Sequence, residues 1–320
     1  MPVALITGVT GQDGSYLSEL LLAKGYEVHG LVRRTATTNT RNIDHLRGRE
    51  GFNLHTGDLL DAGGLHRLVA QLQPDEVFNL GAQSEVHLSF DLPYQTGLVN
   101  AMGVTHLLEA LRVACPDARY YQASSSEMFG KVRETPQNED TPFHPRSPYA
   151  ASKVHAYWLT VNYRESYGLF ACNGILFNHE SPRRGERFLT RKVARAVAQI
   201  EVGQRSTVTL GNLDARRDWG FAPEYVDAMW RMLQHTEADD YVVGTGETHS
   251  VEQWVDAAFS HVGRRWQDHV VQDPKLFRPA EVDLLLADHS KVTDTLGWSP
   301  TVKFAELVGI MVDAELDAIR

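Results

Sequence analysis

The sequence predicts an α/β fold in which a doubly wound parallel sheet carries a smaller, interleaved C-terminal lobe. Two observations support this prediction. Short apolar runs recur along the first half of the chain and are separated by stretches with helical spacing, which is the pattern of βαβ units. The first apolar run ends in a glycine-rich turn that opens a helix, an arrangement typical of a Rossmann-type sheet.

The expected strands of the large lobe are short and apolar. Val3–Thr7 has the composition of a buried parallel strand, and Ser15–Lys24 follows it with leucines at helical spacing. The further strand-like runs are Glu27–Val32, Phe52–Thr56, Glu76–Leu80, Arg119–Ala123 and Phe170–Leu176. Each pair is separated by a helical stretch, so the sequence predicts parallel strands joined through helices.

After about Leu176 the alternation of strands and helices ends in a segment rich in arginine and turn residues. The remaining chain predicts helices at Pro223–His235, Val251–Gly263 and Phe304–Ile319, with a strand at Tyr241–Val243. We therefore expect two lobes. The first is a Rossmann domain of residues 1–176, to which 215–243 returns, and the second is a substrate-binding lobe of residues 177–214 and 244–320.

Composition and charge restrict the class of protein. Of the 320 residues, 42% are hydrophobic and 22% are charged, which is ordinary for a soluble globular protein. The formal net charge of −10 repels nucleic acid and anionic membrane, so we expect neither as a partner. Cys115 and Cys172 lie far apart without zinc-binding spacing, and no apolar run has the length of a membrane span. The sequence predicts a soluble cytoplasmic protein without a metal site.

The glycine-rich turn lies between the first expected strand and the first expected helix, and it reads Gly8-Val9-Thr10-Gly11-Gln12-Asp13-Gly14. Glycines there let the backbone approach a pyrophosphate, which then sits at the helix N-terminus. The GxxGxxG spacing is the variant of short-chain dehydrogenases. The less favoured alternative is a plain tight turn. The residues expected to contact a dinucleotide are Gly8, Thr10, Gly11, Gln12, Asp13 and Gly14.

The end of the second expected strand indicates the type of dinucleotide. NAD enzymes usually carry an acid there for the ribose hydroxyls, whereas this chain has Arg33 and Arg34 after Val32. Arginine pairs with a 2′-phosphate through charge-assisted hydrogen bonds, so Arg33 favours NADP. The alternative is a pair of exposed surface arginines. Two later turns complete the expected cofactor site, with Asp58 and Leu59 after the third strand and Leu80, Gly81, Ala82 and Ser84 after the fourth.

The expected catalytic pair is Tyr149 and Lys153. Their spacing of four residues puts both side chains on one face of a helix that follows the fifth strand. A nearby ammonium lowers the pKa of a phenol, so Tyr149 is expected to act as a base near neutral pH. Only Tyr149 among the eleven tyrosines has a lysine four residues later, although such a spacing also arises by chance.

A hydroxyl and a carboxylate follow the fifth expected strand, at Ser125 and Glu127. Active sites form at the carboxyl ends of parallel strands, so Ser125 is placed to hydrogen-bond the oxygen that Tyr149 deprotonates. A carboxylate at this depth costs desolvation energy unless it has a role, which makes Glu127 a candidate catalytic residue. The alternative for the serines of this segment is a polar turn.

Basic side chains crowd the segment that follows Leu176, where they meet a single acid, Glu186. Because the protein is negative overall, this concentration of cations predicts an anionic substrate such as a diphosphate. The alternative is a solvated helix face. The residues are Arg183, Arg184, Arg187, Arg191, Lys192 and Arg195, with Arg216, Arg217 and Arg278 further on.

Several strings resemble the GDP-mannose 4,6-dehydratase family of extended short-chain dehydrogenases/reductases. They include GVTGQDG at residues 8–14, YQASSSEMFG at 121–130 and FNHESPRRG at 177–185, and the resemblance covers nearly the whole chain. It implies a hydro-lyase that converts GDP-α-D-mannose to GDP-4-dehydro-6-deoxy-D-mannose and water. The implied cofactor is NADP, tightly held and regenerated in each turnover. Ser125 replaces the threonine that is usual in the family.

The resemblance also implies residue roles. Tyr149 removes the 4-hydroxyl proton while hydride passes from C4 to the nicotinamide, Lys153 holds the ribose, and Ser125 steadies the 4-oxygen. Glu127 takes the C5 proton and protonates the departing 6-hydroxyl, and hydride returns to C6. Implied substrate contacts are Ser84, Ser125, Glu127, Asn178, Lys192, Arg217, Arg278 and Glu281, and implied cofactor contacts include Tyr149, Lys153, His179 and Arg184. The loop Arg33–Asn42 is implied to reach a neighbouring subunit of a homotetramer.

Two alternative functions remain open from the sequence. Another nucleotide-sugar enzyme of this fold, a 4-epimerase or an NADPH-dependent 4-reductase, needs Tyr149 and Lys153 but no acid at Glu127. A non-catalytic NADP-binding sensor has little reason to keep these three residues together with the arginine-rich segment.

Overall fold

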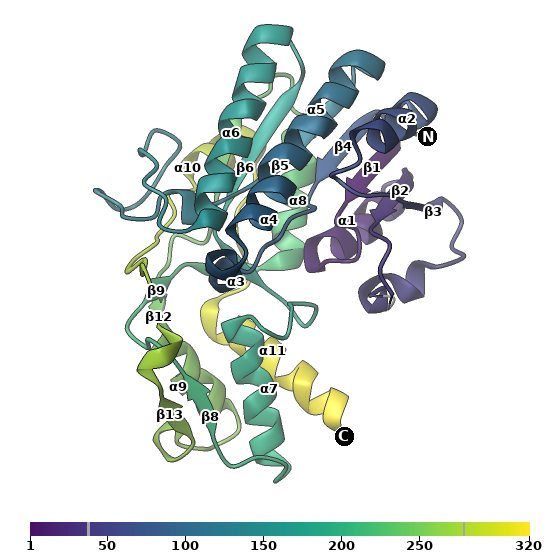
Figure 1. Cartoon of the computed structure of the whole chain (residues 1–320). Coiled ribbons are helices and arrows are strands. Elements are labelled where there is room, and N and C mark those ends of the chain that lie inside the picture. The colour runs from purple at the N-terminus through teal and green to yellow at the C-terminus, as the bar shows by residue number, and fades with distance from the viewer. Residues whose placement is uncertain (37–38, 278) are drawn as a thin grey trace.

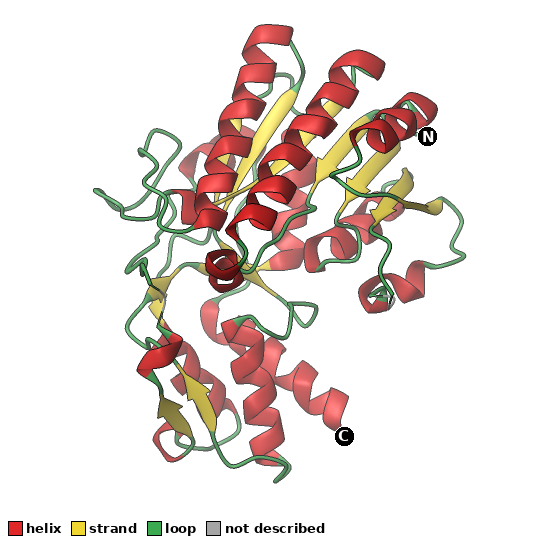
Figure 2. Ribbon diagram, viewed as in Figure 1, coloured by secondary structure: helices red, strands yellow, loops and turns green. Residues whose placement is uncertain are grey.

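The computed structural model describes residues 1–36, 39–277 and 279–320 and confirms the predicted fold class. Seven strands form the main sheet in the order β11-β6-β5-β4-β1-β2-β3, and neighbouring strands run parallel (Figures 1 and 2). Their bounds are β1 (Val3–Thr7), β2 (Glu27–Val32), β3 (Phe52–Thr56), β4 (Glu76–Asn79), β5 (Arg119–Ser125), β6 (Ala171–Leu176) and β11 (Asp240–Val243). The order reverses between β1 and β4, which opens a crevice at their carboxyl ends.

Helices cover both faces of the main sheet. The helices α1 (Gln12–Ala23) and α8 (Ala222–Gln234) pack together on one face, and α2 (Ala62–Leu72), α5 (Gly103–Ala114) and α6 (Pro148–Tyr167) cover the other (Figure 1). Because both faces are covered, central strands such as β1 and β6 are buried along nearly their whole length and read as apolar runs, whereas the edge strand β3 is exposed at Asn53, Leu54 and Thr56.

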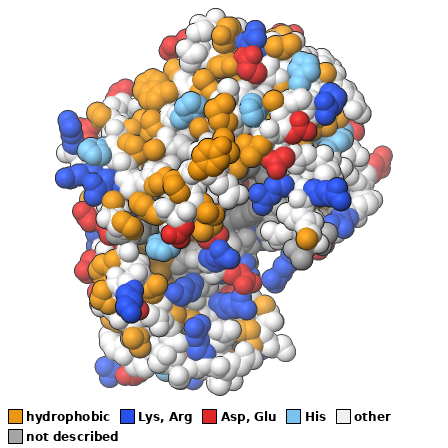
Figure 3. Space-filling model, in the orientation of Figure 1, with side chains coloured by type: hydrophobic (Ala, Val, Ile, Leu, Met, Phe, Trp, Pro, Cys, Tyr) orange, Lys and Arg blue, Asp and Glu red, His pale blue; other side chains and the backbone are white. Residues whose placement is uncertain are grey.

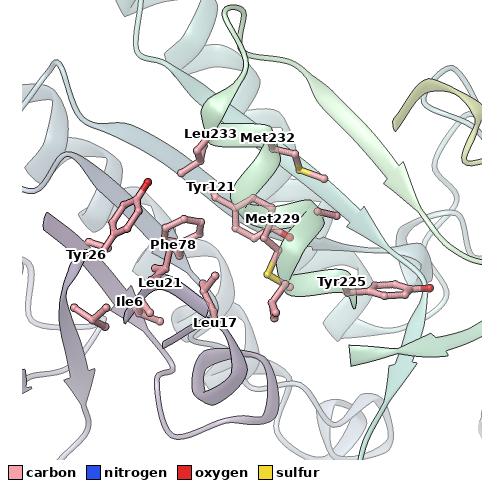
Figure 4. Close-up of a cluster of buried hydrophobic side chains, with 14 of the residues drawn as sticks. Ile6, Leu17, Leu21, Tyr26, Phe78, Tyr121, Tyr225, Met229, Met232 and Leu233 are labelled. Atoms are coloured by element: carbon pink, nitrogen blue, oxygen red, sulfur yellow. The ribbon is translucent and has the colours of Figure 1, made fainter. Parts of the chain in front are cut away.

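Side chains of each strand divide between two cores. Successive residues point to opposite faces, so β1 sends Ile6 to the core under α1 and α8 and sends Leu5 to the core under α5. β5 divides Tyr121 and Tyr120 in the same way. Figure 4 shows the first core, in which Ile6, Phe78 and Tyr121 from the sheet pack with side chains of α1 and α8.

The smaller lobe has its own core. The helices α7 (Leu189–Glu201), α9 (Val251–His261) and α11 (Phe304–Ile319) pack with the parallel pair β8 (Val208–Leu210) and β13 (Val270–Gln272), below the main sheet in Figure 1. The tryptophans Trp219 and Trp254 lie in this core with ring centroids 5.1 Å apart. On this packing we propose that 177–214 and 244–320 form most of the second lobe and that 1–176 with most of 215–243 form the first, while Ala215 and Trp219 join the core of the second.

The remaining elements of the described residues are short. They are η1 (Arg41–Leu46), α3 (Val86–Asp91), α4 (Pro93–Gly97), η2 (Leu98–Met102), η3 (Ser126–Met128), β7 (Asn178–Glu180), β9 (Arg216–Arg217), β10 (Trp219–Phe221), β12 (His249–Ser250), η4 (Trp266–Asp268), η5 (Pro274–Leu276) and α10 (Ser290–Leu296). β7 pairs with β10, and β9 pairs with β12. α10 contacts β11 and α8, so this late segment packs on the first lobe.

Most expected elements are confirmed, with shifts at their ends. α1 begins at Gln12 rather than Ser15, because Gly11 of the turn itself is the N-cap. β5 runs to Ser125 rather than Ala123, which places the serine at the last position of the strand. Within the described residues no helix is long and apolar enough to cross a membrane.

A buried carboxylate joins segments that are far apart in the sequence. Asp218, between β9 and β10, accepts hydrogen bonds from Thr245 N (2.8 Å), Thr245 Oγ1 (2.7 Å), Gly246 N (3.0 Å) and Ala287 N (3.3 Å). Burial raises the pKa of Asp218, and these donors oppose the rise. The carboxylate therefore holds together three backbone segments near the contact between the lobes.

We predict that Asp218→Ala lowers the free energy of unfolding by about 3 kcal/mol, because three amides and a hydroxyl lose their acceptor in a buried place. Urea unfolding followed by circular dichroism measures this change. Asp214→Ala in the same segment is the matched control, since Asp214 is exposed and should shift stability by less than about 0.5 kcal/mol. Equal stabilities of the two variants would contradict the role given to Asp218.

Candidate active site

The glycine-rich turn is shaped by a close approach between β1 and the end of β4. Gly8 has φ +70°, and a Cβ on it would lie 2.8 Å from Gly81 N and from the Leu80 carbonyl carbon. A side chain at Gly14 would lie 2.5 Å from Gly8 O. Both positions therefore require glycine, and α1 begins without a side-chain cap at Gly11. An uncapped helix N-terminus behind a bare backbone turn fits the phosphates of a dinucleotide.

Hydrogen bonds between polar side chains join the carboxyl ends of β1 and β4. Thr7 Oγ1 donates to Asn79 Oδ1 at 2.6 Å and accepts from Gly81 N at 3.0 Å. Asn79 Nδ2 in turn donates to Tyr120 Oη at 3.1 Å and to Gln122 Oε1 at 2.9 Å. This network fixes the turn that carries Leu80, Gly81, Ala82 and Ser84 beside the glycine-rich turn.

A cavity of about 560 Å³ lies at this crevice and extends between the lobes. It brings together residues that are far apart in the sequence, from Asp13 to Leu276. The predicted site residues that line it are Asp13, Leu80, Ala82, Ser84, Ser125, Glu127, Tyr149, Lys153, Asn178, His179, Arg184 and Lys192. An adjoining cavity of about 200 Å³ shares Glu127, Asn178 and Arg184 and adds Arg217 and Glu281.

The catalytic helix α6 presents Tyr149 and Lys153 near its N-terminus. Ser147 caps the helix by accepting a hydrogen bond from Ala150 N at 3.0 Å, and Pro148 occupies the first helical position. Tyr149 and Lys153 are 8% and 5% exposed. Lys153 Nζ donates to Ala123 O at 2.6 Å and lies 5.9 Å from the centroid of the Tyr149 ring.

The pKa of Tyr149 differs from the sequence-based expectation. Burial raises it to about 12, with a hydrogen bond to Ser125 acting in the opposite direction. Burial also lowers the pKa of Lys153 to about 8. The expected net lowering of the Tyr149 pKa is therefore wrong for this structure, in which desolvation dominates and raises it.

Ser125 and Glu127 face the cavity from the end of β5 and the following turn η3. Ser125 is 9% exposed and Glu127 is 8% exposed. Ser125 Oγ accepts from Glu127 N at 3.3 Å, which orients the turn. Glu127 Oε1 lies 4.0 Å from Arg217 Nη2, and Arg217 is itself held by Nη1 contacts to Arg216 O and Val282 O.

The basic segment contributes cations both to the cavity and to ion pairs. Arg184, Arg187 and Lys192 line the larger cavity, although Arg184 also pairs with Glu180 at 3.1 Å and Arg187 with Glu85 at 3.5 Å. Arg183 pairs instead with Glu19 at 2.6 Å, and Arg191 pairs with Glu315 of α11 at 2.7 Å. The sequence predicts one cluster of cations, whereas the fold turns only part of them toward the cavity. Arg191, Lys192 and Arg195 lie on α7, and Arg183, Arg184 and Arg187 lie in the segment before it.

Some predicted residues lie outside the cavity walls. Arg33 is exposed beyond the end of β2, where the adenosine end of a dinucleotide would lie. Asp58 accepts from Leu60 N at 3.0 Å, and Leu59 O lies 2.9 Å from His106 Nδ1. Arg278 lies outside the described residues, as do residues 37 and 38 of the Arg33–Asn42 loop.

The structure adds a residue that sequence reasoning missed. Asn100 lies on the π-helical turn η2, and its Nδ2 donates to Ser152 Oγ at 3.1 Å and to Gln83 O at 2.9 Å. Ser152 Oγ in turn donates to Tyr149 O at 2.7 Å. Asn100 thus supports the backbone of the catalytic helix. An asparagine inside the apolar run Leu98–Met102 was the available signal.

Comparison with known proteins confirms the resemblance. The model of the family described as GDP-mannose 4,6 dehydratase matches residues 5–311. GDP-mannose 4,6 dehydratase 2 of Arabidopsis thaliana is 56% identical over 99% of this chain and 88% of that protein. The human GDP-mannose 4,6 dehydratase is 51% identical over 99% of this chain and 92% of that protein.

Solved structures share the fold over almost the whole chain. The UDP-glucose 4-epimerase of Thermus thermophilus, in complex with NAD, has a TM-score of 0.86 at 28% identity and covers 98% of both chains. RMD from Pseudomonas aeruginosa, complexed with NADPH, has a TM-score of 0.83 at 25% identity, covering 99% of this chain and 100% of that one. With the family match extending from residue 5 to residue 311, this chain belongs to the GDP-mannose 4,6-dehydratase family.

Proposed function

We propose that the protein converts GDP-mannose to GDP-4-dehydro-6-deoxymannose and water. The observation that carries this proposal is the shared cavity faced by Tyr149, Ser125 and Glu127 in a chain of this family. An epimerase or reductase needs the tyrosine but has no use for a carboxylate at Glu127. A buried acid beside the tyrosine therefore favours dehydration over the alternatives.

The proposed cofactor is NADP, which when bound takes hydride from C4 of the sugar and returns it to C6. Support for a nicotinamide cofactor comes from similar structures that hold NAD or NADPH. The bare backbone at Gly8 and the uncapped start of α1 fit its diphosphate. Arg33, with no acid at the end of β2, supports the phosphorylated form.

The first half of the proposed reaction uses α6 and the end of β5. Tyr149 takes the 4-hydroxyl proton, and Ser125, with its hydroxyl bonded to Tyr149, steadies the 4-oxygen. Since burial raises the pKa of Tyr149 to about 12, the phenolate needs a cation. We assign this role to the Lys153 ammonium, held by Ala123 O at 2.6 Å.

The second half of the proposed reaction uses Glu127 twice. The carboxylate takes the C5 proton, which the new 4-ketone acidifies, and then donates a proton to the departing 6-hydroxyl. One group performs both steps because it sits in a nearly buried place, 8% exposed, on the wall shared by the two cavities. The Arg217 guanidinium lies 4.0 Å from this carboxylate.

The proposed substrate site uses cations of the second lobe. Figure 3 shows lysine and arginine side chains around a hollow in this face of the molecule. Arg184, Arg187 and Lys192 line the larger cavity. Burial lowers the pKa of Lys192, whose Nζ donates to Thr209 O at 2.7 Å. Local cations of this kind are what a diphosphate needs in a protein of net charge −10. We place Asn178, Arg217 and Glu281 in the same site.

The proposed setting is a cytoplasmic homotetramer with the Arg33–Asn42 loop at the subunit contact. Arg33 and Arg34 are exposed at the start of this loop, so they are accessible to a neighbouring subunit. We propose no nucleic acid or membrane partner.

We predict that the purified protein forms a product lighter than GDP-mannose by one water without added reductant, because the hydride is returned within one turnover. Mass spectrometry of the reaction mixture measures this. Failure to form the product with NADP bound would exclude the dehydratase.

We predict that Glu127→Gln lowers the rate of water loss roughly 100-fold or more while C4 oxidation continues, since only the acid/base group is removed. Reduced cofactor then accumulates and is followed at its absorbance band. Tyr149→Phe should abolish both steps, and Glu134→Gln, at an exposed site, should change neither. Normal water loss by Glu127→Gln would remove this residue from the mechanism.

We predict that Arg33→Ala weakens NADP binding roughly tenfold or more and leaves NAD binding unchanged, because the 2′-phosphate loses a charge-assisted partner. Titration calorimetry on cofactor-stripped protein measures both affinities. Arg49→Ala, another exposed arginine of this lobe, is the control. An equal loss for both cofactors would assign Arg33 a different role.

A further inference from the structure

A group of four polar side chains ties the glycine-rich turn to the strand that leads into the second lobe. We propose that Gln12, Asp13, His179 and Ser181 form a latch that keeps the dinucleotide resident during turnover. This inference rests on the proposed function, in which the cofactor is oxidised and reduced in place and has no reason to leave. The four are positioning residues in this account.

Hydrogen bonds connect the four residues of the latch to one another. Gln12 Nε2 donates to Asp13 Oδ1 at 2.9 Å and to His179 O at 3.1 Å, and Ser181 Oγ donates to Gln12 Oε1 at 2.8 Å. His179 Nε2 lies 2.9 Å from Asp13 Oδ2. Gln12 and Asp13 belong to the first turn of α1, where the diphosphate is expected. The bonds therefore join the wall of the cofactor site to β7.

His179 must carry a positive charge to make its contacts. Its Nδ1 lies 2.8 Å from Phe177 O and its Nε2 faces the Asp13 carboxylate, so both neighbours are acceptors and both ring nitrogens donate. Burial opposes this charge, but Asp13 raises the pKa of His179 overall. Tyr225 of α8 stacks on the imidazole with centroids 4.7 Å apart and fixes the ring plane.

The positive charge of His179 explains why the protein tolerates the Asp13 carboxylate on the wall of the cofactor site. Asp13 lines the cavity, with its side chain 23% exposed, and an isolated carboxylate there would repel the phosphates of any dinucleotide. The His179 imidazolium neutralises it. Removing the histidine alone leaves the Asp13 carboxylate without its nearest cation, with Gln12 as hydrogen-bond donor and Arg184 as the remaining cation, whereas removing both charges of the pair leaves neutral side chains there.

This difference gives the latch a signature that a merely structural role would not produce. His179→Gln should release labelled NADP roughly tenfold faster or more, because the Asp13 carboxylate then faces the phosphates. Asp13→Asn added to His179→Gln should restore release to within about threefold of the wild type, because two neutral amides can still bond. Glu19→Gln is the matched control, since Glu19 ties the same helix to Arg183 outside the cavity.

The experiment measures exchange of bound radiolabelled NADP against excess unlabelled NADP on the full-length protein, with folding checked by circular dichroism. Wild-type release in His179→Gln, or faster release in the double variant than in the single one, would overturn the latch. If His179→Gln does not fold, Ser181→Ala removes one bond of the set and should accelerate release to a smaller extent; unchanged release would then overturn it.

The readout is independent of the dehydratase reaction. A wild-type protein that forms no product from GDP-mannose but shows the predicted exchange pattern would refute the proposed function and retain the latch. Product formation from GDP-mannose without the predicted exchange pattern would support the proposed function and refute the latch. Saturating NADP in the assay should return the activity of His179→Gln toward the wild-type level, because the latch holds the cofactor and performs no chemistry.

Discussion

The close contact between Gly8 and the Leu80–Gly81 backbone is the constraint on which the rest of the site depends. It brings the carboxyl ends of β1 and β4 to the point where the strand order reverses, with no side chain between them. The uncapped N-terminus of α1 then faces the crevice, the neighbouring strand β5 supplies Ser125, and the turn η3 that follows it supplies Glu127. A Cβ at Gly8 would force this geometry open.

Burial decides the electrostatics of the cavity. It raises the pKa of Tyr149 to about 12 and lowers that of Lys153 to about 8, so desolvation opposes the charged form of both members of the catalytic pair. The Asp13 carboxylate and the His179 imidazolium stabilise each other's charged form at a distance of 2.9 Å. The cavity thus holds a tyrosine whose deprotonation is opposed by burial, next to a charged pair of side chains. The proposed chemistry needs groups whose protonation changes during the reaction.

The two lobes contribute different chemistry. The first lobe presents backbone and hydroxyl groups for a dinucleotide, and the second presents Arg184, Arg187 and Lys192. Asp218 and the short strands β7 and β9 connect them, so the cations stand at a set distance from the catalytic helix. Placing the cavity between lobes lets one sheet serve a large anionic substrate despite the negative net charge of the protein.

The sequence by itself determined the parallel sheet, since strands covered on both faces read as apolar runs, and it located the glycine-rich turn and Tyr149 with Lys153. These features depend on neighbours along the chain. Only the tertiary structure decided which basic residues face the cavity, the direction of the Tyr149 pKa shift, and the support that Asn100 gives to the catalytic helix. Such features depend on desolvation and on contacts between residues distant in sequence, such as Asp13 with His179, which no local pattern encodes.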